Sequence, residues 1–292
     1  MTHDPAAKRL RRLLCLAALL LCTSTVGHAA AVAVSDDAAL KSWSQHFAEE
    51  VDHRLEVPPD AQQAYITRLQ QALTEAQIDD TSAQAFVLVD RSPQVQAAFV
   101  VLRTPSNAWH WLGATAVSTG KVGQYEHFVT PLGVFAHTLA NPDFRAEGTY
   151  NKNKIRGYGL KGLRVFDFGW QTAERGWGEG GKSLMRLQMH ATDPTTLEGR
   201  LGTVQSEGCV RIPTTLNRFL DQHGVLDAQY EAALAEGQKL WIIKPGRALI
   251  PWPGNYLVVV DSGATERPAW SPLPVIARPV KPARKASAKK LR

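Results

Sequence analysis

The chain has 292 residues, which is enough for one sizeable domain with appendages. Hydrophobic residues make up 44% of the chain and charged residues 21%, and these ordinary fractions exclude a chain that is disordered throughout. The formal net charge of +6 is concentrated near the two ends, so the total charge says little about the middle of the chain.

The first predicted element is a secretory signal peptide over residues 1–31. Basic residues precede an apolar run at 13–26, which is too short to span a bilayer comfortably, and small residues suited to cleavage follow it. Cys22 lies in this region, but Leu21 stands where a lipoprotein signal needs a small residue. We therefore expect a periplasmic product that has no lipid anchor and no stable transmembrane segment after cleavage.

Residues 32–80 are predicted to form a helical prefix that carries no chemistry of its own. Asp60, three positions before a glutamine, resembles the start of a capping box. Apolar residues then recur at four-residue spacing, at Tyr65, Leu69 and Leu73. One apolar face of this kind is typical of a helix that packs on a larger domain.

From residue 81 to residue 246 the pattern changes to short β-rich runs separated by turn residues. This pattern predicts a mainly antiparallel β domain with few helices. The expected strands cover residues 85–89, 95–102, 112–117, 133–139, 184–190 and 239–243. One helix is expected over residues 214–223, because Gly224 follows it in the position of a helix C-cap.

A long stretch at residues 141–182 is rich in glycine and aromatic residues, including Trp170. Segments of this length without secondary structure are usually functional or disordered, and the aromatic content argues against disorder. Packing in the core is the ordinary role for these rings. The alternative, functional interpretation is a movable lid over a bound peptide, because several glycines would let the segment move.

Residues 247–292 are predicted to be a Pro-rich basic tail that is partly disordered, although residues 256–261 have strand character. The tail is either simply solvated or adheres to an anionic envelope surface. Nucleic acid is not an expected partner, because an exported protein does not meet it.

The mature chain keeps a single cysteine, Cys209, because the other two leave with the signal peptide. A lone thiol in an exported protein cannot form an internal disulfide, so it is either a reactive group or a buried apolar residue. Gly208 would let the backbone turn tightly before it, aim the thiol outward and leave N–H groups free for an oxyanion. His190, at the end of a predicted strand, is the candidate base.

Neighbouring residues extend this candidate site. Arg211 would favour the thiolate and could bind a carboxylate. Ser206 could orient the base, hold the turn by hydrogen bonding or act as an alternative nucleophile. Thr192 is a weaker orienting candidate. Glu207, Thr192 and Trp170 complete the expected substrate-binding residues.

A histidine followed, after a spacer, by Ser-x-Gly-Cys-x-Arg at residues 206–211 resembles the signature of the L,D-transpeptidase (YkuD-like) family. The sequence TPLGVF at residues 130–135 resembles an upstream segment of the same family. The resemblance extends over roughly residues 83–245 and implies a β-sandwich or barrel in which Cys209 is the nucleophile and His190 its base. It implies no metal or organic cofactor. A zinc site that adds His137 to this pair is disfavoured, because the spacing fits no tight metal motif.

The resemblance also implies a reaction on peptidoglycan stem peptides. The thiol attacks the third, dibasic residue at its L-centre, the terminal D-alanine leaves, and a thioester forms. An amine acceptor then gives a cross-link or an anchored protein, whereas water gives a carboxypeptidase. Two alternatives stay open: a hydrolase of the same bond or of a protein–peptidoglycan linkage, and a weakly active wall-binding protein.

The sequence departs from the family pattern at two positions. Glu207 stands where the family usually has histidine, and Ala191 where glycine usually follows the base. A carboxylate next to the nucleophile opposes thiolate formation if it is ionised and close. We therefore expect Glu207 to pair with Arg211 or to make another structural contact.

Overall fold

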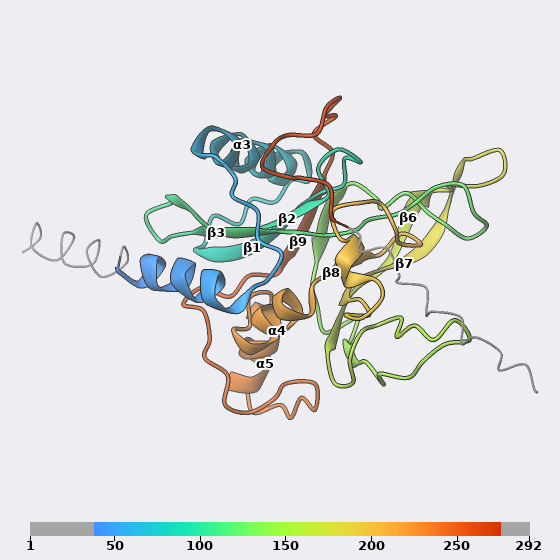
Figure 1. The fold of residues 1–292 in the computed structure, drawn as a ribbon. Coiled ribbons are helices and arrows are strands. Elements are labelled where there is room, and N and C mark those ends of the chain that lie inside the picture. Colours follow the sequence, from blue (N-terminus) through green and yellow to red (C-terminus); the bar gives the residue numbers. More distant parts are fainter. Residues whose placement is uncertain (1–37, 276–292) are drawn as a thin grey trace, which may run out of the picture.

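Two β-sheets form the centre of the molecule in the computed structural model, which describes residues 38–275 (Figure 1). One sheet has five strands in the order β3-β2-β1-β9-β4, and the other has four in the order β5-β6-β7-β8. The predicted signal peptide and the basic end of the tail lie outside the described residues. Within residues 38–275, no helix has the length and apolar character needed to cross a membrane.

The five-stranded sheet is covered on both faces. Its strands are β1 (Gln84–Asp90), β2 (Ala97–Arg103), β3 (Trp109–Ala116), β4 (Gly133–Ala136) and β9 (Tyr256–Val260). Every residue of β1 and β2 is buried, as expected for strands that are enclosed on two sides. Phe86 and Leu88 belong to one apolar cluster, whereas Val87 and Val89 belong to the other, which lies between the two sheets.

The helical prefix packs on this sheet as the sequence predicted. Helix α3 (Pro59–Glu75) buries Tyr65, Leu69 and Leu73 in the same cluster as Phe86. The Tyr65 hydroxyl donates to Asp90 at 2.6 Å. The expected capping box is not formed, because Pro58 occupies the N-cap position and no side chain caps the helix.

The second sheet holds the strands nearest the predicted site. They are β5 (Phe144–Arg145), β6 (Arg164–Glu174), β7 (Lys182–Ala191) and β8 (Val210–Ile212). The remaining elements are a helix over residues 38–50, the short helix η1 (Glu198–Arg200) and the helices α4 (Thr214–Gln222) and α5 (Ala228–Ala235). The fold is mainly β with few helices, but two strand pairs, β1 with β9 and β7 with β8, run parallel.

Three expectations about the elements need correction. The stretch at 141–182 is not one loop, because β6 crosses it and pairs with β7, which leaves a shorter loop at 146–163. Residues 239–243 form turns rather than a strand. The sheet continues past residue 246, where the catalytic domain was expected to end, because β9 lies between β1 and β4.

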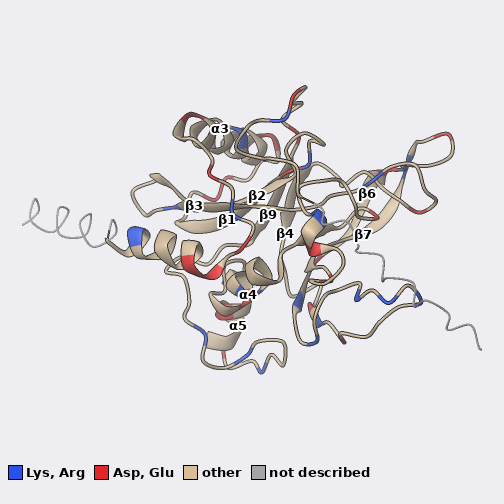
Figure 2. Cartoon of the chain, viewed as in Figure 1, with Lys and Arg blue, Asp and Glu red and all other residues tan. Residues whose placement is uncertain are grey.

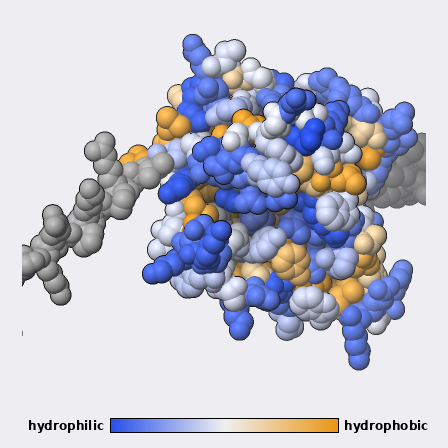
Figure 3. All heavy atoms as spheres, turned by 90° about the vertical axis from the view of Figure 1, so that its right-hand side faces the viewer, coloured by the Kyte–Doolittle hydropathy of each residue, from blue (hydrophilic) through white to orange (hydrophobic). Residues whose placement is uncertain are grey.

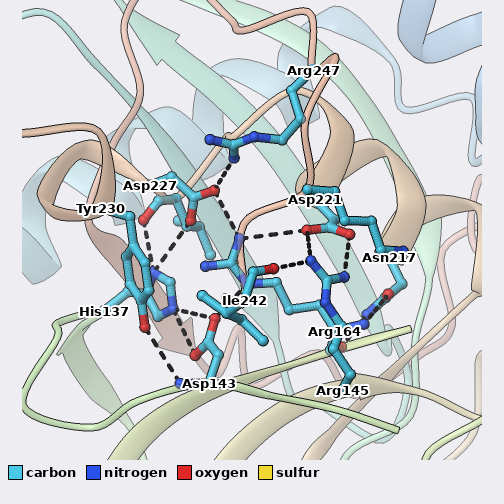
Figure 4. A network of polar contacts seen from close by, with 12 residues as sticks. His137, Asp143, Arg145, Arg164, Asn217, Asp221, Asp227, Tyr230, Ile242 and Arg247 are labelled. Carbon is cyan, nitrogen blue, oxygen red and sulfur yellow. Dashed lines mark hydrogen bonds and ion pairs between the residues drawn. The ribbon is translucent and has the colours of Figure 1, made fainter. Parts of the chain in front are cut away.

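A buried ionic network fastens the lower part of the second sheet to α4 and α5 (Figure 4). Arg164, fully buried, donates to Asp143 at 2.5 Å and to Asp227 at 2.8 Å. His137 lies between the Leu226 carbonyl at 2.8 Å and Asp143 at 2.9 Å. The imidazole considered for a zinc site therefore serves this network. Within residues 38–275, no group of three or more His, Cys, Asp or Glu side chains has the arrangement of a metal site.

The surface around the second sheet is mixed in polarity. The coloured cartoon of Figure 2 marks several Lys and Arg positions along the projecting 146–163 loop. On the face that carries the β6–β7 hairpin, apolar patches alternate with hydrophilic residues (Figure 3). Two of the exposed apolar side chains, Trp170 and Leu184, belong to this hairpin.

Candidate active site

The candidate site lies on one face of the second sheet, where β7 and β8 run side by side. Alternate side chains of β7 enter the core between the sheets, namely Met185, Leu187 and Met189. The side chains between them face the opposite side: Arg186, Gln188 and His190. The strand register pairs His190 with Arg211. If the same register is extended by two residues toward the start of both strands, Cys209 lies beside Gln188. The predicted nucleophile and base are therefore diagonal neighbours on the same face.

Hydroxyl groups from two separate segments hold the turn that carries Cys209. Ser206 Oγ accepts from the Gly208 N–H at 3.1 Å and donates to the Cys209 carbonyl at 2.6 Å. Thr130 Oγ1 donates to the Gly208 carbonyl at 2.7 Å. Gly208 has a φ of +129°, and a Cβ there would lie 2.8 Å from the sulfur of Met185. Only glycine fits this turn without strain.

The peptide unit between Gly208 and Cys209 is oriented by the same contact. In a trans peptide the C=O and the N–H point in opposite directions. Because Thr130 holds the Gly208 carbonyl, the Cys209 N–H points the other way, and it donates to no backbone or side-chain acceptor among residues 38–275. This N–H is a candidate donor for an oxyanion.

His190 has one ring nitrogen committed and one available. Its Nδ1 lies 2.7 Å from the Ala191 carbonyl, which can only accept, so Nδ1 carries the proton and Nε2 keeps its lone pair. Burial lowers the pKa of His190 to about 4, and the charge of Arg211 acts in the same direction. The imidazole is therefore neutral near pH 7 and can accept a proton at Nε2.

The thiol of Cys209 is also neutral at rest. Its Sγ lies 3.7 Å from the Arg186 carbonyl, and no hydrogen bond joins it to His190 in the described part of the chain. Burial raises the pKa of the thiol to about 11; Arg211 opposes this shift and Glu207 adds to it. The proton must consequently leave the sulfur as the sulfur attacks, rather than beforehand.

The pairing expected between Glu207 and Arg211 is not present. Glu207 is exposed and forms no ion pair with a described residue, whereas Arg211 Nη1 donates to the Gln205 carbonyl at 3.1 Å. Arg211 Nε is buried without a partner in residues 38–275, and so are Ser118 Oγ and Thr192 Oγ1. Ser118 pairs with Arg211 through the backbone. These three atoms are buried, so the structure leaves polar groups without partners inside this end of the site.

One aromatic side chain of the expected lid reaches the predicted base. The ring centroid of Tyr158 lies 4.7 Å from that of His190 in an edge-on arrangement. The Tyr158 hydroxyl donates to Gln188 Oε1 at 3.1 Å. The pKa of Tyr158 is raised, first by burial and then by the nearness of Cys209. The 146–163 loop therefore contacts the site through this residue.

Sequence reasoning missed the polar support beneath the site. Asp167 is buried and accepts hydrogen bonds from the Gly169 N–H at 2.8 Å, Gln188 Nε2 at 2.9 Å and Arg186 Nε at 3.0 Å. Trp170, predicted to bind substrate, lies on β6 opposite Arg186 and is 62% exposed. The alternation of polar residues on β7 before the histidine was the signal that could have identified Arg186 and Gln188.

Acyl transfer requires a nucleophile, a base and an oxyanion donor. The thiol on its glycine turn, the neutral imidazole and the Cys209 N–H are the candidates for these three parts. A separate groove of about 450 Å³ lies between α3 and the β4–β9 edge, and none of its lining residues belongs to this site. Neither a protein-family model nor a curated protein matches the chain.

Proposed function

We propose that this protein is a periplasmic cysteine acyltransferase of the L,D-transpeptidase type that acts on peptidoglycan stem peptides. The observation that carries this proposal is the arrangement of Cys209, on its glycine turn, beside an imidazole whose Nε2 is free. Thr130 adds support, because its bond to the Gly208 carbonyl joins the two sequence segments that resemble the family.

The proposed reaction has two halves. The sulfur of Cys209 attacks the carbonyl carbon of the third stem residue while its proton passes to His190 Nε2, and the Cys209 N–H stabilises the oxyanion. The carbon–nitrogen bond then breaks, and His190 returns the proton to the departing D-alanine amine. In the second half an acceptor amine attacks the thioester, loses its proton to His190, and releases the thiol. Water in place of the amine gives hydrolysis.

The resting geometry assigns a role to substrate binding in this scheme. The thiol contacts the Arg186 carbonyl, so a rotation about its side-chain bond must bring the sulfur toward His190. At the His190 end, the partly buried Arg211 can receive the carboxylate of the departing D-alanine.

Mass spectrometry of the products from a purified disaccharide-tetrapeptide tests the proposal. The expected products are a dimer that has lost one D-alanine and, where water competes, a tripeptide. Cys209→Ala should form neither product while keeping the wild-type melting temperature within a few degrees. Wild-type turnover by a folded Cys209→Ala protein would refute the assignment.

The neutral resting thiol favours a second candidate, a wall-binding protein with little catalytic activity. Its thiol would remain protonated even with a peptide bound, because burial and Glu207 both raise the thiol pKa. A carbapenem separates the two candidates: an acyltransferase gains the mass of the drug on Cys209, whereas a binding protein does not.

A further inference from the structure

We infer that Arg186, flanked by Trp170 and Leu184, forms a subsite for a substrate side chain that ends in a carboxylate, on the acyl-donor side of the scissile bond. This inference rests on the proposed function and goes beyond it, because it assigns the feature of the donor peptide that the enzyme selects.

The guanidinium of Arg186 is held in place from below. Its Nε lies 3.0 Å from both carboxylate oxygens of buried Asp167, and the two oxygens are shared with the Gly169 N–H and the Gln188 amide. Three donors therefore already satisfy Asp167. The terminal amino groups of Arg186 have no partner within residues 38–275, and 36% of the side chain is exposed. A fixed guanidinium with both terminal amino groups available suits a carboxylate.

Exposed apolar side chains surround this guanidinium. Trp170 lies directly opposite Arg186 on β6, and its ring centroid is 5.8 Å from the Arg186 guanidinium carbon. Leu184 lies two residues before Arg186 on β7 and therefore on the same face. Both apolar side chains are 62% exposed. The methylene groups of a substrate side chain can cover them while its end reaches Arg186.

The direction of β7 decides which part of the peptide lies here. Along the strand, the face opposite the core between the sheets carries Arg186, then Gln188 beside the thiol, then His190. The departing amine must lie at the His190 end, because His190 protonates it. The retained acyl residue consequently extends toward Arg186, whose own carbonyl is 3.7 Å from the sulfur.

Two donor peptides that differ in one group test this subsite. The first is a tetrapeptide whose third residue is meso-diaminopimelate, and the second carries the amide of its side-chain carboxylate. For the wild type we expect kcat/KM to be about tenfold higher for the free carboxylate, the scale of a charged hydrogen bond at a partly exposed site. Arg186→Gln should lower kcat/KM for the free carboxylate to the value for the amide. Arg200→Gln, an exposed arginine outside the site, should keep the preference.

Two further variants distinguish loss of the subsite from a folding defect in Arg186→Gln. Leu184→Asp changes an exposed residue, and the charge beside Arg186 should repel the free carboxylate but not the amide, which removes the preference. Trp170→Ala should lower kcat/KM by the same factor for both peptides. A preference that survives in both Arg186→Gln and Leu184→Asp would overturn the subsite, and so would an equal loss for the two peptides in Arg186→Gln.

Equilibrium binding distinguishes this inference from the proposed function. If the wild type acylates neither peptide nor carbapenem, the transpeptidase proposal fails, and binding of the same two peptides to Cys209→Ala then decides the subsite. Tighter binding of the free carboxylate that disappears with Arg186→Gln supports the subsite. Equal binding of the two peptides refutes it.

Discussion

Cys209 and His190 keep their neutral forms at rest, and this property distinguishes them from a preformed thiolate–imidazolium pair. Burial raises the pKa of the thiol to about 11 and lowers that of the imidazole to about 4. Both shifts disfavour the charged forms, as desolvation does. The proposed enzyme would therefore keep its thiol poorly reactive toward small electrophiles until a peptide aligns the two groups.

The pH dependence of acylation follows from these two values. His190 can accept a proton only while it is neutral, so the carbapenem acylation rate should fall as the pH drops through about 4. Between about pH 5 and 9 neither group of the free enzyme titrates, and the rate should be flat. Stopped-flow acylation across this range checks the expectation. An inflection near the ordinary histidine pKa of about 6.5 would contradict the buried, neutral imidazole.

Replacing the His190 side chain measures how much this residue contributes to the acylation rate. His190→Gln should slow acylation by about two to four orders of magnitude, the usual scale for a general base. An unchanged rate would mean that another group removes the thiol proton.

Glu207 is the residue whose sequence-based expectation changed most. It was expected to pair with Arg211, but no such ion pair forms, and its charge adds to the raised thiol pKa of Cys209. Glu207→Gln should therefore lower the pH midpoint of Cys209 alkylation by iodoacetamide, because a repelling negative charge is removed. Glu207→Asp keeps the charge and is the matched control. An unmoved midpoint in Glu207→Gln would show that solvent screens this carboxylate completely.

Among the elements, the turn before Cys209 makes the strictest demand on the sequence. Gly208→Ala would force a Cβ against Met185 at a φ that side chains rarely adopt. We expect it to lower the free energy of unfolding by about 1–3 kcal/mol and to slow acylation as well. Gly199→Ala is the matched control, because open space surrounds that position and its φ is not positive. Urea denaturation of both variants measures the difference, and equal stabilities would contradict the argument.

The same elements show how far sequence reasoning reached. Runs of β-forming residues between turn residues predicted β1, β2 and β7 near their observed bounds, and a following glycine predicted α4, because local pattern decides such elements. β6 was missed because its aromatic and glycine residues, such as Trp170 and Gly169, have the composition of a loop. Cys209, Gly208 and His190 were predicted as candidate site residues, because their chemical types alone suggest a nucleophile, its turn and its base. Arg186, Asp167 and Gln188 were not, since only strand pairing brings them together.

For the whole molecule, the buried network around Arg164 should decide stability. Burial alone would raise the pKa of Asp143, but His137 and Arg164 more than offset this and hold it below its ordinary value. The stabilisation is therefore present above the ordinary carboxyl range and is lost as the pH falls through the lowered pKa. Asp143→Asn should lower the free energy of unfolding by about 3–5 kcal/mol at pH 7, and by less in acid.

A surface ion pair provides the comparison for this prediction. Asp261 pairs with Arg91 at 3.3 Å and remains partly exposed, so Asp261→Asn should cost less than about 1 kcal/mol. Urea denaturation at pH 7 and in acid measures both variants. Equal losses in the free energy of unfolding would show that the buried Asp143 network stabilises the protein no more than a surface ion pair does.

The position of β9 sets the order in which the chain can fold. β9 pairs in parallel with β1, so that Phe86 meets Tyr256, and it also pairs with β4. The first four strands of the chain therefore cannot complete their sheet until residue 260 has emerged from the ribosome. Pairing strands that are so far apart in sequence requires the closure of a long loop. The entropy cost of this closure comes before the stabilising contacts form, and it slows folding. For the proposed exported protein this delay would be an advantage, because the early strands stay unpaired while the last strand is still being made.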